Sequence, residues 1–524
     1  SLIGLLEAEE HQHVRLFVRR DVLQRNISIL VVVPRDRFDA NLRRNLQDLF
    51  LQRYEGVSVD YQLTLGETGD ARIHFTVWVE GSIPLVPFDD LEREVYSLTR
   101  TWEDRVAETL AGTREQVEAR ALVDAHAHRY PSSFRVSVPL DEAAHSVADV
   151  DALLSTNDRI RVGIHNQTAH GEPLTRIVLY SRDGKRDLSE ILPLVEDLGL
   201  RVIEEIPTSL SGEDDADDLF AHDFGVLAFD GQGLDVEACG SRVAAALTAT
   251  LRGESESDGL SRLLVLTDLD YRRINILRAY RSYWHLVNPA FSKPYVADAF
   301  AAHPDIAGDL VGLFEARFSP EAEADAEAAL RSSLVARLDA VGSLDEDRIL
   351  RGFLGLIDAT VRTSAYLETD VLAFKLLSRR VPAVPEPKPL YEIFVFAPDV
   401  AGVHLRGGPV ARGGIRWSIR REDYRTEVLG LMKAQMTKNV VIVPTGAKGG
   451  FVLRHIAGES SGPSSVEVMS VYRSFIGGLL VVTDNVVAVR VVHNVGVRVL
   501  DGEDPYFVVA AYRGTATFSD TAND

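Results

Sequence analysis

Residues 410–452 read VARGGIRWSIRREDYRTEVLGLMKAQMTKNVVIVPTGAKGGFV, and the rest of the chain is best interpreted outward from this stretch. Between residues 401 and 454 there are ten lysine or arginine side chains and three acidic ones, although the 524-residue chain has a net charge of −22. A local excess of positive charge inside an acidic protein suggests a site for an anion.

The middle of the stretch has the spacing of a helix. Four residues recur at i, i+3, i+4 and i+7, which is one face of a 3.6-residue period: Val428, Leu431, Met432 and Gln435. We therefore predict a helix over residues 420–440. Lys438 follows Gln435 by three residues, so both side chains lie on the same flank near the end of that helix.

The flanks of the helix are rich in glycine. Gly413 and Gly414 allow the backbone to approach a ligand closely. Residues 440–443 are predicted to form a short buried strand, and residues 445–450 (TGAKGG) a loop that presents Lys448. A lysine in a partly desolvated loop among other cations can serve as an acid or a base. A Gly-Ala-Lys-Gly-Gly loop taken alone is an ordinary turn, and it lacks the spacing of a P-loop.

The ordered combination of these motifs resembles the substrate domain of glutamate dehydrogenases. The segments LRGGPVARGGIRWS, EVLGLMKAQM and GAKGGFV are similar to the large bacterial NAD-dependent class almost residue for residue. The ending DGEDPYFVVAAYRGTATFSDTAN resembles the same class. These motifs cover roughly the last 130 residues, whereas the earlier part of the chain resembles the class only in architecture.

The resemblance implies an enzyme that oxidises L-glutamate to 2-oxoglutarate and ammonia with NAD. Lys448 corresponds to the catalytic lysine that polarises the substrate oxygen and activates water. Lys438, Gln435 and the backbone at Gly414 correspond to the grip on the α-carboxylate. Arg412 corresponds to the contact with the side-chain carboxylate, which an arginine can hold through two hydrogen bonds.

One position departs from the family pattern. Tyr512 stands where the family has the aspartate that is expected to shuttle a proton to the amino group. A phenol with a pKa near ~10 is a poor base at neutral pH. Residues 481–500 depart as well, because they are rich in valine where the family has a polar, proline-bearing segment. A second hypothesis therefore stays open, a non-catalytic regulatory protein of ligand-binding ACT-like domains with a degenerate substrate domain.

The first part of the chain predicts small α+β modules. Strands are expected at residues 14–18 and 27–33, a helix at 39–54, and a hairpin over 57–65 and 72–77. This order suggests a ferredoxin-like sandwich of the ACT type, and the order recurs after residue 158. Residues 260–377 read as helical almost throughout. Ser319, Pro320 and Glu321 have the pattern of a helix start within that region.

The expected fold class is α/β, or α+β overall, with ACT-like sandwiches, a helical region and an α/β substrate domain. The expected domains are an ACT-like domain (1–85), a helical connector (86–135), a second ACT-like domain (136–255), a helical domain (256–380), a proline-rich linker (381–390) and the substrate domain (391–524). No G-x-G-x-x-G follows a predicted strand, so NAD is expected to bind mainly to a domain absent from this chain.

The amino-acid composition limits the classes of partner that this chain is expected to bind. The acidic balance argues against nucleic acid, and no apolar run is long enough to span a membrane. A single cysteine, Cys239, is typical of a cytoplasmic protein without an intrachain disulfide. The acidic cluster at residues 213–218 lacks the glycine and terminal glutamate of an EF-hand, so no metal site is predicted. Expected partners are glutamate and 2-oxoglutarate, a candidate amino-acid effector at the ACT-like domains, and further copies in a homo-oligomer.

Overall fold

The computed structural model describes residues 14–21, 25–65, 70–167, 173–210, 218–323, 325–438, 445–454, 463–511 and 518. The chain divides into two compact units. The first comprises Ser1–Thr156 with Leu210–Asp215, and the second comprises Asn157–Ser209 with Ala216–Asp524. Among the described residues no helix is both long enough and apolar enough to cross a membrane.

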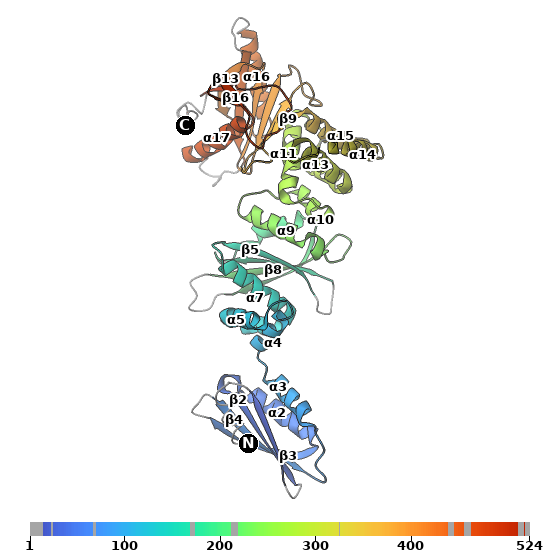
Figure 1. The fold of residues 1–524 in the computed structure, drawn as a ribbon, viewed down its shortest axis with the longest axis vertical. Coiled ribbons are helices and arrows are strands. Elements are labelled where there is room, and N and C mark those ends of the chain that lie inside the picture. Colours follow the sequence, from blue (N-terminus) through green and yellow to red (C-terminus); the bar gives the residue numbers. More distant parts are fainter. Residues whose placement is uncertain are drawn as a thin grey trace. The chain divides into compact units, whose positions relative to one another are not determined.

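Unit 1 begins with a four-stranded antiparallel sheet in the order β1-β2-β4-β3 (Figure 1). Alternate residues of β4 are fully buried, and they pack against α2 and α3 on one face of the sheet. Asp39 caps α2 by accepting a hydrogen bond from the backbone of Leu42 at 2.6 Å. The elements are β1 Arg15–Arg20, β2 Asn26–Pro34, α2 Ala40–Arg53, β3 Gly56–Leu65, β4 Asp70–Val79 and α3 Phe88–Thr99. The predicted strands, helix and hairpin are all confirmed, with shifts of a few residues.

The rest of unit 1 consists of short helices. Thr101 and Asp104 form a capping box at the start of α4. Tyr130 packs against Trp102 with ring centroids 5.4 Å apart and so links the loop after α5 to α4. The helices are α4 Trp102–Leu110, α5 Gln116–His126, α6 Ser132–Ser137 and α7 Leu140–Leu154.

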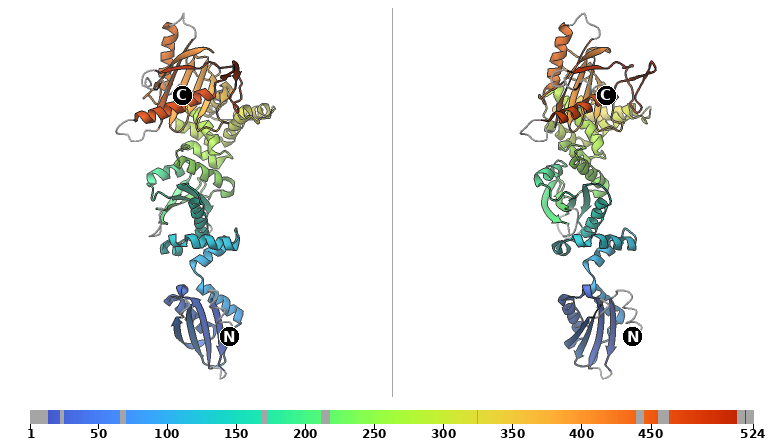
Figure 2. Two further views of the ribbon diagram at one scale, coloured as in Figure 1. Left: turned by 60° about the vertical axis from the view of Figure 1, so that its left-hand side comes forward. Right: turned by 90° about the vertical axis from the view of Figure 1, so that its left-hand side faces the viewer.

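Unit 2 opens with a second four-stranded antiparallel sheet, in the order β5-β6-β8-β7. Its chain order, two strands, a helix, two strands and a helix, is the same as that of the first sheet (Figure 2). The predicted repetition of element order is therefore confirmed. The elements are β5 Ile160–Asn166, β6 Thr175–Ser181, α8 Leu188–Glu196, β7 Arg201–Ser209, β8 Phe220–Leu227 and α9 Val236–Leu251. The acidic cluster at 213–218 lies outside the described residues except for Asp218.

A helical region follows and shares one continuous apolar core with the sheets on either side of it. The prediction of helix up to residue 377 is wrong beyond Ala359, because β9 and β10 are strands. Both are short and largely buried, and a short buried strand cannot be distinguished from a helix by periodicity alone. The helices are α10 Leu263–Leu266, α11 Tyr271–Val287, α12 Lys293–Ala302, α13 Pro304–Phe318, α14 Ala326–Leu338 and α15 Leu344–Ala359.

The predicted helix start at Ser319 is also wrong. Ser319 is the C-terminal cap of α13, and α14 begins only at Ala326. The Ser319 hydroxyl still accepts a hydrogen bond from the backbone of Glu321 at 3.3 Å, so the local capping contact forms within a turn. Leu334 and Leu338 are fully buried, as a core-facing helix requires.

The largest sheet has seven strands in the order β17-β13-β14-β12-β11-β10-β9. β13 is parallel to both β14 and β17, and the other pairs are antiparallel. α16 covers one face and α17 the other, since their buried residues belong to different apolar cores. The elements are β9 Thr360–Thr363, β10 Leu372–Leu377, β11 Tyr391–Phe396, β12 Val400–Arg406, β13 Ala411–Trp417, α16 Tyr424–Lys438, β14 Thr445–Leu453, α17 Ser465–Val481 and β17 Val508–Ala511.

Two segments whose structure was predicted from the sequence lie in this sheet or connect its strands. Residues 381–390, which are rich in proline, connect the neighbouring strands β10 and β11, with Val381 and Val384 buried. Residues 445–450, predicted to be a loop, form the first two-thirds of β14 instead. The predicted strand at 440–443 lies outside the described residues.

Candidate functional site

Arg412 and Gly414 lie on β13, and Lys448 lies on the neighbouring parallel strand β14. Arg412 is paired with Gly446 of β14 and with Val508 of β17, and Gly414 is paired with Ala510. Lys448 follows Gly446 by two positions, so strand alternation directs it to the same face as Arg412. The sheet therefore brings together the two cations that the sequence places 36 residues apart.

α16 covers this face of the sheet. Two glycines of β14 allow the close contact, because an added Cβ at Gly450 would lie 2.5 Å from Val428 and one at Gly446 would lie 3.0 Å from Gln435. The predicted helical stripe is confirmed, since Val428 and Met432 are fully buried. Lys448 thus lies half-buried between the two glycines, beneath the helix.

Gln435 connects the helix to the strand that carries Arg412. Its Nε2 donates a hydrogen bond to the backbone oxygen of Arg412 at 3.3 Å. Its Oε1 is buried and has no hydrogen-bond partner among the described residues. The side chain therefore keeps a buried acceptor without a partner, while one of its two N–H groups donates to the protein.

Gly413 is required for a reason that the sequence did not indicate. An added Cβ at this position would lie 1.5 Å from the backbone oxygen of Ala447. The close approach is between two strands of the sheet, β13 and β14, rather than between the backbone and a ligand. Any side chain at residue 413 would separate the strands that carry Arg412 and Lys448.

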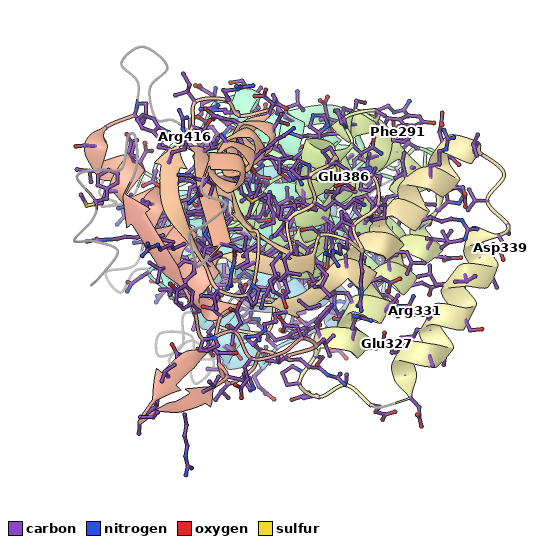
Figure 3. All side chains as sticks on the ribbon, turned by 90° about the horizontal axis from the view of Figure 1, so that it is seen from above. Phe291, Glu327, Arg331, Asp339, Glu386 and Arg416 are labelled. Carbon is purple, nitrogen blue, oxygen red and sulfur yellow. The ribbon has the colours of Figure 1, made fainter. Side chains whose placement is uncertain are left out.

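The positive charge of residues 401–454 is only partly available to a ligand. Several of the described arginines form ion pairs with carboxylates of unit 2: Arg406 with Asp504, Arg416 with Glu427, Arg420 with Asp423, Arg425 with Glu392, and Arg454 with Glu256. Figure 3 labels Arg416. Arg412 is exposed, and no carboxylate among the described residues pairs with it. Arg412 is thus suited to bind an anion.

Arg425 fixes the start of α16. Its guanidinium donates to Glu392 of β11 at 2.9 and 2.6 Å, and the Tyr283 hydroxyl of α11 donates to the same carboxylate at 2.7 Å. All three side chains are fully buried, and burial raises the pKa of Tyr283. Arg425 is therefore a buried structural residue and not part of a solvated helix face.

Two of the predicted site residues have side chains outside the described part of the chain. α16 ends at Lys438, whose side chain lies outside the described part. Tyr512 lies just beyond β17 and outside the described residues. The geometry of the site therefore rests on Arg412, Gly414, Gln435 and Lys448.

Comparison with known proteins gives four matches along the chain. Residues 333–524 match the family model of the bacterial NAD-glutamate dehydrogenase catalytic domain. Residues 15–103 match the glutamate dehydrogenase ACT2 domain, residues 159–239 the ACT3 domain, and residues 255–320 helical motif 3. The order of the matches follows the order of the elements described above.

The chain is also similar to curated proteins over its full length. It is 38% identical to the NAD-specific glutamate dehydrogenase of Halomonas elongata and 37% identical to that of Pseudomonas aeruginosa, over 100% of this chain and 33% of each relative. It is 36% identical to the Mycobacterium tuberculosis protein of the same name, over 99% of this chain and 34% of that protein. The chain spans about a third of the length of these relatives.

Proposed function

Because this chain belongs to the bacterial NAD-specific glutamate dehydrogenase family, we propose that it carries the substrate site of an enzyme that oxidatively deaminates L-glutamate to 2-oxoglutarate and ammonia, with NAD as oxidant. The observation that supports this most is the register of β13 and β14, with Arg412 and Lys448 on one face beneath α16. The parallel pairing of the strands and the close packing of α16 on the glycines of β14 hold this arrangement in place, as positioned catalytic groups require.

In this proposal Arg412 holds the side-chain carboxylate of the substrate through two hydrogen bonds. Lys438 and the backbone at Gly414 hold the α-carboxylate. Lys448 donates to the substrate oxygen as negative charge develops there, and it assists the attack of water. Such electrostatic stabilisation commonly contributes the largest share of catalysis.

The proposed role of Gln435 follows from its hydrogen bonds. One N–H of Nε2 donates to the Arg412 backbone, whereas the buried Oε1 has no partner, so Oε1 is the atom that a ligand has to satisfy, and it can only accept. We assign Oε1 to the amino group of glutamate, or to an N–H of the imine, instead of to a carboxylate. A donor on the ligand would satisfy an oxygen that is otherwise buried without a partner.

The cofactor is assigned mainly to residues outside this chain. No strand–turn–helix unit among the described residues carries G-x-G-x-x-G, and the sheet that bears the site is mixed. We therefore assign none of the described residues to NAD. An amino-acid effector at the two ACT-type sheets, assembly as a homo-oligomer and a cytoplasmic location belong to the same proposal.

Substrate binding is the first test, and calorimetry with 2-oxoglutarate measures it directly. The chain should bind, and Arg412→Ala should weaken binding about 10- to 100-fold, as expected for a lost charged hydrogen-bond pair. Lys438→Ala should weaken binding as well. Arg421→Ala is the matched control, since Arg421 is an exposed arginine of the same stretch. An affinity of Arg412→Ala equal to that of the control would remove the proposed carboxylate site.

The tyrosine at position 512 supports the alternative that this chain is a non-catalytic regulatory protein with a degenerate substrate domain. If proton transfer is what this position lacks, Tyr512→Asp in the complete enzyme should raise turnover by roughly 10²–10⁴-fold, the contribution of a positioned base. Tyr512→Phe is the control and should leave turnover unchanged. Turnover that is high already in the wild type, and insensitive to both substitutions, would show that another group transfers the proton.

A further inference from the structure

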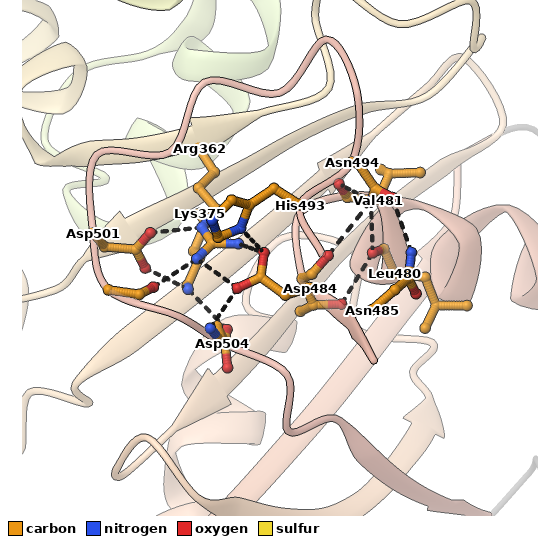
Figure 4. A network of polar contacts seen from close by, with 12 residues as sticks. Arg362, Lys375, Leu480, Val481, Asp484, Asn485, His493, Asn494, Asp501 and Asp504 are labelled. Atoms are coloured by element: carbon orange, nitrogen blue, oxygen red, sulfur yellow. Dashed lines mark hydrogen bonds and ion pairs between the residues drawn. The ribbon is translucent and has the colours of Figure 1, made fainter. Parts of the chain in front are cut away.

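Six charged side chains form a buried network on the face of the seven-stranded sheet opposite α16. Figure 4 shows Arg362, Lys375, Asp484, Asp501 and Asp504 of this network. Three cations come from strands, Arg362 from β9, Lys375 from β10 and Arg406 from β12. Three carboxylates come from the segment between α17 and β17, namely Asp484, Asp501 and Asp504. Each of the six side chains is at most 5% exposed, and the charges balance.

The network holds the segment 484–504 against the sheet. Arg362 donates to Asp484 at 2.6 Å and to Asp501 at 2.6 Å, and Lys375 contacts Asp501 at 2.5 Å and Asp504 at 2.8 Å. Burial by itself would raise the pKa of Asp504, but Arg406 and Lys375 outweigh burial and lower it. Asp501 and Asp504 are thus committed to the network by their ion pairs, which makes them unsuitable as proton carriers for the substrate.

Arg406 differs from the other two cations, because it contacts two chain segments that enter the candidate site. Its guanidinium donates to Asp504 at 2.6 Å, to the backbone oxygen of Tyr506 at 3.1 Å, and to the backbone oxygen of Pro409. Pro409 precedes β13 by two residues, and Tyr506 precedes β17 by two residues. One side chain therefore fixes the starting points of both strands.

The turn between β12 and β13 is also tied to β14. The backbone of Gly407 donates to the backbone oxygen of Gly446 at 3.0 Å, and that of Thr445 donates to the backbone oxygen of Val410 at 2.9 Å. The starts of β13, β14 and β17 thus meet at the turn that Arg406 holds. Arg412 lies three residues beyond Pro409, and Lys448 lies two residues beyond Gly446.

We propose that Arg406, held by Asp504, is a positioning residue that sets β13 and β17 against β14 and so sets the distance between Arg412 and Lys448. This inference rests on the proposed function of those two side chains as the substrate site. The role requires arginine, because three acceptors in different directions match the planar fork of a guanidinium and cannot all be reached by one ammonium group.

The test compares two equally buried arginines of the same network. Arg406→Lys and Arg362→Lys both keep the charge and remove contacts, so both should lower the melting temperature. Arg406→Lys should also raise the dissociation constant of 2-oxoglutarate at least about tenfold, whereas Arg362→Lys should change it less than about twofold. Arg362 contacts Asp484, Asp501 and the Gly502 backbone, none of which leads directly into a strand of the site.

Hydrogen exchange provides a readout that does not depend on ligand. In Arg406→Lys the amides of residues 411–417 and 508–511 should lose protection, while those of β9 and β10 should keep it. Asp504→Asn removes the other half of the contact and should give the same pattern. Equal affinity losses in Arg406→Lys and Arg362→Lys, or unchanged protection of β13 and β17, would overturn the positioning role. Absence of 2-oxoglutarate binding in the wild type would refute the proposed function, and hydrogen exchange would still decide the role of Arg406.

Discussion

Lys448 is the residue whose position matters most for the proposed chemistry. It lies on β14, with a glycine two residues to each side on the same face, so nothing on its own strand screens it from a ligand beneath α16. A strand fixes the Cα of the lysine more tightly than a loop would. The side chain can therefore act on charge that develops at one point in space.

In the complete enzyme, Lys448→Ala should lower kcat by on the order of 10²–10³ with a much smaller change in KM. Steady-state kinetics at saturating glutamate and NAD would measure both constants. Lys433→Ala, an exposed lysine of α16, is the control and should leave kcat unchanged. A variant with normal kcat and a raised KM would make Lys448 a binding residue instead.

His404 is a second informative residue, although it takes no part in the proposed chemistry. It is 2% exposed on β12, packs against Phe507 with ring centroids 5.5 Å apart, and neither ring nitrogen has a partner among the described residues. Burial, with a smaller contribution from Arg406, lowers the pKa of His404 to about 3. The folded protein thus holds this histidine neutral at pH values where the unfolded chain protonates it.

The stability of unit 2 should therefore fall as the pH falls from about 6.5, the pKa in the unfolded chain, towards about 3. Only the unfolded state binds the proton in this range. The free energy of unfolding should therefore fall by up to about 1.4 kcal/mol for each pH unit. His404→Leu should remove this contribution. Urea unfolding of both proteins between pH 7 and pH 4 measures it, and parallel pH profiles would contradict the prediction.

At the scale of elements, the hairpin of β15 Asn485–Val487 and β16 Arg490–Val492 is under local strain. The two turn residues, Ala488 and Val489, have φ values of 49° and 69°. Two-residue hairpin turns of this kind favour Asn-Gly, because a β-branched residue is strained at positive φ. The strands pair only with each other among the described residues, and they stand out from the rest of unit 2 in Figure 3.

Ala488→Asn combined with Val489→Gly should stabilise the protein by about 1–2 kcal/mol, since each left-handed residue other than glycine costs about that order. Val489 is 95% exposed, so its removal takes away no packing. Urea unfolding gives the difference. Val495→Gly is the control, because it removes a valine that is 94% exposed and lies outside the turn. It should not raise the free energy of unfolding. An equal gain from both changes would attribute the effect to lost surface valine rather than to relieved strain.

α16 covers the candidate site, and contacts at both ends of the helix fix its position on the sheet. Its first turn is fixed by the buried Arg425–Glu392–Tyr283 cluster, and its last turn is fixed where Gln435 bonds to Arg412. Two glycines of β14 let it pack closely in between. A helix held in this way cannot shift along the sheet without breaking one of these contacts, so the spacing between Gln435 and Lys448 is set by packing.

For the whole molecule, the division into two compact units predicts how ligand affects unfolding. The candidate site lies entirely in unit 2, and a ligand stabilises only the folded state that binds it. Scanning calorimetry should resolve two transitions, and 2-oxoglutarate at 100 times its dissociation constant should add about 2.7 kcal/mol to one of them. Succinate, which lacks the keto group, is a useful comparison ligand.

The other transition should keep its midpoint. At the same ligand concentration, Arg412→Ala should reduce the stabilisation to about 0.4–1.4 kcal/mol without moving the transition of unit 1. A shift of both transitions by the same amount would show that the two units unfold as one, and the assignment of the ligand effect to unit 2 would have to be withdrawn.

Much of the architecture can be predicted from the sequence, because the relevant signals are local. Alternation along β4, the Asp39 cap of α2 and the 3.6-residue stripe of α16 all involve neighbours within a few residues. The repeated order of strands and helices follows from the same signals. The order and spacing of the glycine and lysine motifs between residues 410 and 452 likewise carry the resemblance to the family whose model matches residues 333–524, and that resemblance is the source of the proposed roles of Arg412 and Lys448.

Only the tertiary structure decided which charges remain for a ligand and which strands carry them. Arg406 and Asp504 are 98 residues apart in sequence, and Arg362 and Asp501 are 139 apart, so no local pattern reveals that they pair. Arg425 has the pattern of a surface residue and is fully buried, because Glu392 and Tyr283 reach it from other elements. β9, β10 and the start of β14 are strands because neighbouring strands supply their hydrogen bonds. Pairing between distant segments depends on how the whole chain packs, and it leaves no periodic trace in the sequence of any one of them.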